Sequence, residues 1–476
     1  MNKNIFLIST FLLATLSLSA QNEQDALRYS FLQTGGTARS MSMGGAFGAL
    51  GGDFSSLSIN PAGLGIFRKG TFSFSPEFQS SYATAHFLGS KNTDSRYRIA
   101  FGQFGVVIPL SFNNEGGLKG LNFAIGYNKL RDFNQNVTMQ GVNHTSSLVD
   151  EFVYSANTKS SLDPFSEGLA WETWLIDTLS GGTEYYSDFT GSDYGQIQRR
   201  TISKKGQVGE YVIGLSANLN QKFFMGASLG IQKASYTEVW EHTELDPDDV
   251  INFFQGFSFR NQLETTGTGL NLKVGFLAKP FEFIRIAGAL HTPTFFNFND
   301  TFTASMSTDL ADGQDTHTWD NYGEFNYEIT TPFRAVGSVA VVLKKIGLVS
   351  LDYEYVDYSQ ARLRGTDYDF FDENQAVSTR YRPASNIRIG AEYRMMNLFF
   401  RGGYAFYQSP YVSGEPNHPY NLSVISAGMG YRDSNFFFDV GISRGASEMK
   451  YFLYADNSAD LKNIQSRFTM TLGIRF

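Results

Sequence analysis

Residues 467–476, RFTMTLGIRF, end the chain with a strict alternation of apolar and polar side chains. The even positions carry Phe468, Met470, Leu472, Ile474 and Phe476, whereas the odd positions carry Arg467, Thr469, Thr471, Gly473 and Arg475. Because successive side chains of a β-strand point to opposite faces, this segment would present one apolar and one polar face. The pattern suits a barrel wall that has lipid on one side and water on the other.

The same alternation recurs upstream, for example in residues 387–394, 425–432 and 435–444. We predict strands near 70–88, 97–112, 119–134, 208–220, 222–240, 265–279, 281–294, 325–343, 346–361, 379–395, 397–408, 420–432, 435–449 and 465–476. Every second connection is short and the others are long, the longest spanning 135–207. The predicted fold is all-β, a transmembrane antiparallel β-barrel of about 14 strands over residues 70–476. A soluble sandwich whose charged side faces water is the alternative.

The composition of the 476 residues favours the membrane barrel. Aromatic residues make up 15% and charged residues only 18%, yet no apolar run of about 18 residues follows the first 20 positions. Only helices and closed barrels satisfy every backbone hydrogen bond in lipid, so a membrane protein of this kind is expected to be a barrel. The net charge of −8 and the lack of a Lys/Arg cluster argue against a nucleic-acid partner.

Residues 1–20 have the layout of a secretory signal peptide. Lys3 precedes an apolar run over residues 5–18, which is too short for a membrane-spanning helix, and small residues follow. We expect cleavage after Ala20 and a mature chain located outside the cytoplasm. The sequence has no cysteine, so neither a disulfide nor a cysteine-linked lipid anchor is expected.

Residues 34–64, TGGTARSMSMGGAFGALGGDFSSLSINPAGL, combine many glycines with apolar side chains. The glycines disfavour a regular helix or strand, whereas Met43, Phe47, Leu50 and Phe54 favour burial. A barrel of about 14 strands has room inside, so we predict that residues 21–69 form a compact plug within it. A flexible N-terminal tail is the alternative.

Several short motifs in this stretch carry a resemblance to a known family. Gly36-Thr37-Ala38-Arg39, Met43-Gly44-Gly45-Ala46, Asp53 and Asn60-Pro61-Ala62-Gly63-Leu64 resemble the N-terminal hatch of the FadL/TodX-type long-chain fatty acid transporters of the outer membrane. Residues 331–333, 352–359 and 401–404 resemble later strands of that family, and a terminal Phe476 looks like the assembly signal of bacterial outer-membrane barrels. The resemblance assigns hatch roles to Gly36, Arg39, Gly44, Gly45, Asp53, Asn60, Pro61 and Ala62.

The resemblance implies a monomeric channel of the bacterial outer membrane that takes up hydrophobic small molecules such as long-chain fatty acids. Ligands would be captured by external loops, pass to a pocket in the barrel and leave sideways into the bilayer through a gap gated by the hatch. A candidate for the gap lies near Gly102 and Gln103, where the outward positions change from odd (Ile99, Phe101) to even (Phe104). Such a change indicates a β-bulge, and an ordinary bulge without a gap is the alternative.

Two sets of residues are candidates for ligand binding. Asp163 and Pro164 in the long loop are typical of a helix start, and the apolar side of that helix would carry Phe165, Leu169, Trp171, Trp174 and Leu175. This helix could gather ligand or cap the barrel mouth. A carboxylate ligand would need a cation, and strand parity places Lys273, Arg285, Arg388 and Arg401 in the lumen, where pairing with Asp352, Glu354 and Glu392 is the alternative.

The residue pattern does not indicate an enzyme. The six histidines are scattered, with no close pair that would suit zinc, and no G-x-S-x-G motif precedes a helix. We therefore expect no catalysis, no metal and no cofactor. Two other functions stay open beside uptake: an envelope partner in secretion or assembly, as in PorV-like members of the same superfamily, and a non-selective porin.

Overall fold

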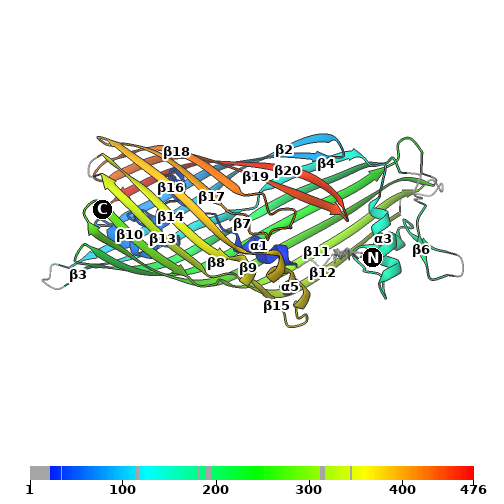
Figure 1. Ribbon diagram of the computed structural model, residues 1–476, viewed down its shortest axis with the longest axis horizontal. Coiled ribbons are helices and arrows are strands. Elements are labelled where there is room, and N and C mark those ends of the chain that lie inside the picture. The colour runs from blue at the N-terminus through cyan, green and yellow to red at the C-terminus, as the bar shows by residue number, and fades with distance from the viewer. Residues whose placement is uncertain are drawn as a thin grey trace, which may run out of the picture.

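The computed structural model describes residues 22–33, 35–112, 117–179, 182–188, 194–251, 253–310, 317–343 and 346–476. The predicted signal peptide, residues 1–20, lies outside this part of the chain, as does Thr34. Figure 1 shows an elongated barrel, with the C-terminus and the short turns at one end and the long loops with α3 at the other. We call these the short-turn end and the long-loop end.

Fourteen antiparallel strands close the barrel, because β20 pairs with β1, which confirms the predicted fold class. In order around the wall they are β1 (Thr71–Phe87), β2 (Ser90–Ser111), β3 (Leu118–Asp132), β7 (Ile197–Leu219), β8 (Phe223–Leu245), β9 (Phe254–Phe281), β10 (Ile284–His291), β13 (Arg334–Leu343), β14 (Gly347–Asp357), β16 (Pro383–Met395), β17 (Leu398–Tyr407), β18 (Leu422–Arg432), β19 (Phe436–Tyr454) and β20 (Asn457–Arg475). In β20, Phe468 and Leu472 are exposed while Thr469 and Thr471 are buried, as the alternation predicts.

Three details differ from the sequence prediction. The segment 325–343 is two strands, because Pro332 separates β13 from β12 (His317–Thr330). The hairpin of β12 and β11 (Phe295–Leu310), missing from the prediction, pairs with the outer half of β9. The span 135–207 is not all loop, since it contains β4 (Gln135–Val142) and the first residues of β7.

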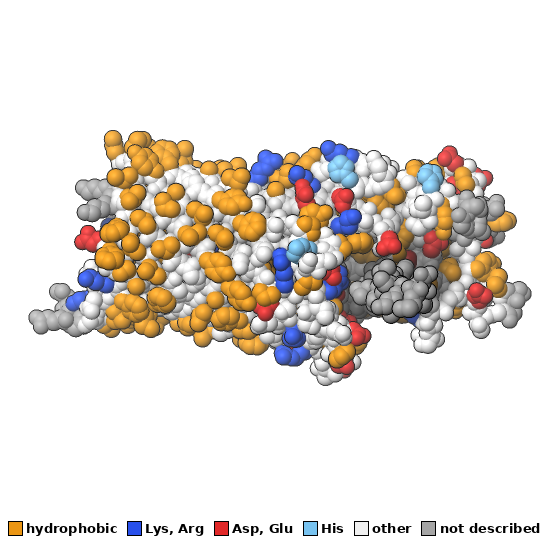
Figure 2. All heavy atoms as spheres, in the orientation of Figure 1, with side chains coloured by type: hydrophobic (Ala, Val, Ile, Leu, Met, Phe, Trp, Pro, Cys, Tyr) orange, Lys and Arg blue, Asp and Glu red, His pale blue; other side chains and the backbone are white. Residues whose placement is uncertain are grey.

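The strands are longer than the apolar zone of the wall. Figure 2 shows apolar side chains covering the half of the barrel at the short-turn end, whereas charged side chains are spread over the other half. An apolar band about 25 Å tall is what a bilayer requires, so the long-loop half projects into water. Alternating apolar residues therefore do not mark the strand segments beyond the bilayer. None of the described helices is long and apolar enough to cross a membrane.

The N-terminal segment forms a plug inside the barrel, as predicted. It comprises α1 (Glu23–Ser30), α2 (Ala38–Ser42) and the 3₁₀ helices η1 (Phe54–Ser58) and η2 (Pro61–Ile66). Phe47 and Leu50 pack with Phe224 and Leu277 of the wall, and Leu57 packs in a second cluster with Val107, Ala124 and Val212. This burial of apolar surface holds a glycine-rich segment in one place.

The remaining elements lie in the connections that join the strands at the ends opposite the short turns. They are α3 (Leu148–Thr158), α4 (Glu167–Glu172), β5 (Asp177–Thr178), β6 (Tyr185–Tyr186), η3 (Tyr358–Gln360), β15 (Arg362–Arg364) and α5 (Phe371–Arg380). A buried carboxylate anchors the start of α3: Glu244 accepts hydrogen bonds from Ser147 Oγ at 2.6 Å and the Leu148 amide at 2.9 Å. The helix is therefore fixed to the wall at β8.

Candidate functional site

Within the plug, Asp53 and Gly36 hold two separate segments of the chain together. Asp53 caps η1 by accepting from the Ser55 amide at 3.0 Å, and it also accepts from Thr37 Oγ1 at 2.8 Å. Gly36 has a φ of +126°, and a Cβ there would lie 2.1 Å from Ser55 Oγ. The aspartate and the glycine thus bring residues 36–37 and 53–55 together into one compact unit.

Two further motifs fasten the plug to the wall. Gly44, with a φ of +63°, donates its amide hydrogen to Ser426 Oγ at 3.0 Å, and Gly45 beside it has a φ of +74°. Asn60 Nδ2 donates to the Gly48 carbonyl at 2.9 Å and to the Phe276 carbonyl of β9 at 3.0 Å. Its Oδ1 accepts from the Ala62 amide at 3.1 Å, and Pro61 begins η2. Asn60 therefore joins two plug segments to the barrel.

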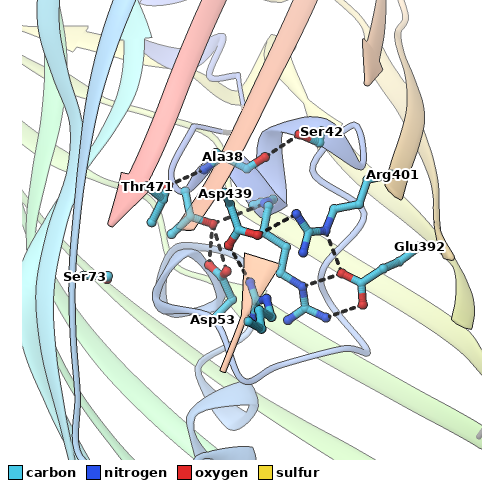
Figure 3. A network of polar contacts seen from close by, with 12 residues as sticks. Ala38, Ser42, Asp53, Ser73, Glu392, Arg401, Asp439 and Thr471 are labelled. Atoms are coloured by element: carbon cyan, nitrogen blue, oxygen red, sulfur yellow. Dashed lines mark hydrogen bonds and ion pairs between the residues drawn. The ribbon is translucent and has the colours of Figure 1, made fainter. Parts of the chain in front are cut away.

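A chain of alternating charges links the plug to β16–β19. Arg39 donates to both carboxylate oxygens of Glu392, at 2.9 and 3.0 Å. Figure 3 shows Arg401 between Glu392 and Asp439, which it contacts at 2.7 Å each. Arg432 contacts the other oxygen of Asp439 at 2.6 Å. Three arginines thus share two carboxylates, all of them buried or half-buried.

Replacing Glu392 by glutamine is expected to destabilise the folded protein by about 3–5 kcal/mol, because Arg39 and Arg401 lose their shared charge in a buried place. Urea unfolding of the purified protein measures the free energy. The matched control is Glu448→Gln, which breaks an exposed pair with Lys462 at 3.3 Å and should cost less than about 1 kcal/mol. Equal effects of the two substitutions would show that the network does not hold the plug.

The cations predicted to face the lumen lie inside the barrel. Lys273 pairs with Glu210, Arg388 contacts Glu354 at 3.2 Å, and Arg285 donates to the Leu50 carbonyl of the plug at 2.6 Å. Arg401 belongs to the charge network. Lys273, Arg388 and Arg401 therefore have carboxylate partners, whereas the contact of Arg285 is a neutral carbonyl, and their roles in ligand binding stay predictions.

The predicted loop helix is shorter than the sequence indicates. Asp163 Oδ1 accepts from the Phe165 amide at 2.9 Å within a turn, and α4 begins only at Glu167. The apolar side chains predicted to share one side of this helix differ in how far they are buried. Leu169 and Leu175 are buried among α3, β9 and β11 residues, Trp171 stacks edge-on with Tyr185, and Trp174 is 60% exposed.

A cavity of about 290 Å³ lies at the barrel mouth, and we call it the mouth cavity. Phe165, Phe152, Trp240, Phe259 and Phe302 supply aromatic side chains to its lining. Of the five predicted loop residues, only Phe165 lines it; its ring centroid is 4.7 Å from that of Phe302. Phe152 of α3 and the wall aromatics were not predicted, because their contributions depend on which strands meet at the mouth.

The charges around the mouth cavity are balanced. Four acids, Asp25, Glu151, Glu167 and Glu238, face four bases, Arg28, Lys159, Arg200 and Lys204. Lys159 contacts Glu167 at 2.8 Å and Lys204 contacts Glu238 at 3.4 Å. Burial favours the neutral form of Glu167, but hydrogen bonds from Lys159 and Ser166 outweigh it and lower the pKa of that carboxyl. The cavity therefore offers aromatic surface rather than excess charge.

The wall contains a seam between β2 and β3. The two strands pair from Ser111 to Gln103, and no further ladder joins β2 to β3 or β4 among the described residues, although β2 stays paired with β1 up to Ser90. The register between β1 and β2 shifts at the residue where the β2–β3 pairing ends. Ser75 pairs with Gln103 and Pro76 pairs with Phe101, so Gly102 is an extra residue in β2. The predicted bulge is confirmed.

A cavity of about 440 Å³ opens on the wall beside the seam. Ile99, Phe101, Phe104 and Tyr211 line it from the outer face, and Ile99 is 80% exposed. The plug lies directly behind, since a Cβ on Gly102 would be 3.4 Å from the Gly36 carbonyl oxygen. Further along the seam, only side chains cross it in the described part of the chain, such as Arg96 to Asn136 at 2.8 Å and Arg98 to Gln207 at 3.1 Å.

A pair of charges inside the seam was not predicted. Lys129 of β3 contacts Glu77 of β1 at 3.2 Å, and both are buried next to Gly35 and Gly36 of the plug. In the sequence, only the alternation of the two strands indicates that Lys129 and Glu77 face inward. Among the described residues, no group of three or more His, Asp or Glu side chains is placed to hold a metal ion.

Solved structures of transport channels share this fold. A Pseudomonas aeruginosa FadL homologue matches 94% of this chain and 100% of its own length, with 13% identity and a TM-score of 0.55. The toluene transporter TodX of P. putida matches with coverages of 93% and 99%, 14% identity and a TM-score of 0.57. The toluene transporter TbuX of Ralstonia pickettii matches 93% of this chain and 99% of its own length, with 15% identity and a TM-score of 0.50.

The geometry and these likenesses show that the chain has the fold of the FadL/TodX-type β-barrels, with an N-terminal plug. The resemblance noted in the sequence is therefore confirmed at the level of the fold. No protein-family model and no curated protein matches the chain.

Proposed function

We propose that the chain is an outer-membrane channel for the uptake of hydrophobic small molecules, with long-chain fatty acids and similar apolar compounds as its substrate class. The observation that carries the proposal is the seam between β2 and β3, whose inner end carries the exposed apolar residues Ile99 and Phe101 and lies directly in front of the plug. The fold likeness to a FadL homologue and to the toluene transporter TodX supports it.

The proposed route uses three features in order. Ligand is captured in the aromatic mouth cavity, moves down to the plug and leaves through the seam into the bilayer when the plug shifts. An apolar molecule gains little from a water-filled pore, whereas a path that ends in lipid avoids exposing its surface to water. The protein works without catalysis, as a monomer, after cleavage of its signal peptide.

The test compares uptake by cells that express the chain with uptake by cells that lack it. We expect faster uptake of a radiolabelled long-chain fatty acid and of a monoaromatic hydrocarbon, and unchanged uptake of a small sugar. Equal acceleration of all three compounds would indicate a porin. No acceleration of any compound, together with envelope proteins that co-purify at a fixed ratio, would indicate the secretion-partner alternative.

A further inference from the structure

A cavity of about 330 Å³ lies between the plug and the wall at the short-turn end, and we call it the short-turn cavity. Plug residues 50–54 and 66–69 line it on one side. The other side is formed by residues at the short-turn ends of six strands, β1, β2, β10, β14, β18 and β20, and by Phe437 of β19. The plug separates this cavity from another of about 210 Å³, which Gly44, Gly45 and Met41 line on the opposite side.

Cations dominate the lining of the short-turn cavity. Six line it, Arg39, Arg68, Lys69, Arg285, Arg432 and Arg475, against a single acid, Asp53. That acid already accepts hydrogen bonds from Thr37 and Ser55. The cavity thus differs from the mouth cavity, where acids and bases are equal in number.

Four of these cations have no carboxylate within ion-pair distance among the described residues. The contacts of Arg285, Arg475 and Lys69 are backbone carbonyls, those of Leu50, Asp433 and Ser434, at 2.6, 2.9 and 3.2 Å. Arg68 is exposed. Arg285 Nε is buried without a hydrogen-bond partner, so the guanidinium retains capacity for an oxyanion.

Apolar side chains form part of the remaining lining, beside Thr37, Thr71 and Ser73. Leu50, Phe54, Phe67 and Leu348 contribute, and the guanidinium groups of Arg432 and Arg475 lie 5.0 and 5.2 Å from the ring centroid of Phe437. A site that joins unpaired cations to apolar surface suits a molecule with a charged oxyanion head and an apolar chain. A small inorganic anion would leave the apolar surface unused.

We propose that the short-turn cavity binds anionic amphiphiles through their oxyanion head, with Arg285 and Arg68 as head-group ligands and Leu50 and Phe54 in contact with the chain. The inference rests on the proposed function, because an amphiphile reaches the plug region by the uptake route. The short-turn cavity would select ligands by their negative charge, whereas the mouth cavity would not.

The experiment uses the full-length protein in detergent and two photoreactive probes, a diazirine-bearing long-chain fatty acid and the fatty alcohol of the same length. Mass spectrometry of the digested protein locates the adducts. We expect the acid, and not the alcohol, to label the peptides that contain residues 50–54 and 66–68. Competition with an unlabelled fatty acid or an alkyl phosphate should remove this labelling, and the more effective competitor identifies a carboxylate or a phosphate as the preferred head.

Two variants and a control test the role of the arginines. Arg68→Gln and Arg285→Gln should each reduce acid labelling at these peptides by about tenfold, the loss that one charge-assisted contact represents. Among the described residues, Arg68 makes no hydrogen bond or ion pair whose loss would confound its result. Lys222→Gln, an exposed cation in the β7–β8 turn at the same end, should leave labelling unchanged.

Three results would overturn the inference: equal labelling by the alcohol, unchanged labelling in both arginine variants, or displacement of the acid by inorganic phosphate. Labelling at the mouth cavity, near Phe165 and Phe302, reports the proposed function separately, since both probes should react there. If the mouth is labelled and the short-turn cavity is not, the inference alone fails. If neither is labelled, both fail.

Discussion

Deletion of residues 34–64 is expected to raise the ionic conductance of the barrel in a planar bilayer by at least about tenfold, because a 14-stranded barrel without its plug has a water-filled lumen. In the intact protein this space holds Met43, Phe47, Leu50 and Leu57, all packed against the wall. Single-channel recordings of the intact and deleted proteins measure the change.

The deletion is informative only if the barrel still closes. Circular dichroism of the purified variant should therefore show the strand signal of the intact protein, which the continuous ladder from β1 to β20 predicts. A closed barrel whose conductance stays at the intact level would contradict the role of residues 34–64 as a plug.

Deletion of Gly102 is expected to reduce uptake of hydrophobic compounds by at least about tenfold, because removal of the bulge lets the backbone groups of β2 and β3 pair and closes the seam. Pro76 already pairs with Phe101 and Ser75 with Gln103. Deletion of Gly102 therefore leaves the inward and outward positions of the other β2 residues unchanged. Uptake of a labelled fatty acid by cells is the measurement.

Gly102→Ala is the matched control, since it keeps the extra residue. Its Cβ would meet the end of the Glu77 side chain at 2.9 Å, which can move, and lies 3.4 Å from the Gly36 carbonyl. We expect near-normal uptake in this variant. Full uptake after deletion of Gly102 would show that ligands do not leave through the seam.

The wall of the barrel was predictable because its outward and inward residues differ in kind. In β20 and β18, successive residues alternate between the outer and the inner face of the wall. The same alternation correctly predicted that Arg388 and Arg401 lie inside. The same rule is weak beyond the bilayer, where both faces are wet. That is why the β11–β12 hairpin and the outer part of β7, residues 197–207, escaped prediction.

The contacts of the plug and of the cavities were not predictable from one sequence. Arg39 and Glu392 are more than 350 residues apart, and their pairing depends on how the closed wall places β16 beside the plug. The six cations of the short-turn cavity come from five separate stretches of chain. Spacing along the sequence carries no information on contacts between such distant residues. The bulge at Gly102 is local, and the change of outward-facing residues from odd to even positions was visible in the sequence.

The molecules that the protein retains during purification report most directly on whether it is a channel for hydrophobic compounds. The detergent-extracted protein is compared by mass spectrometry with another outer-membrane barrel that was purified in the same way. For such a channel we expect a long-chain acid or a hydrocarbon to be enriched at about one molecule per protein, the occupancy of a single enclosed site. No enriched apolar molecule, with other envelope proteins bound at a fixed ratio instead, would contradict it.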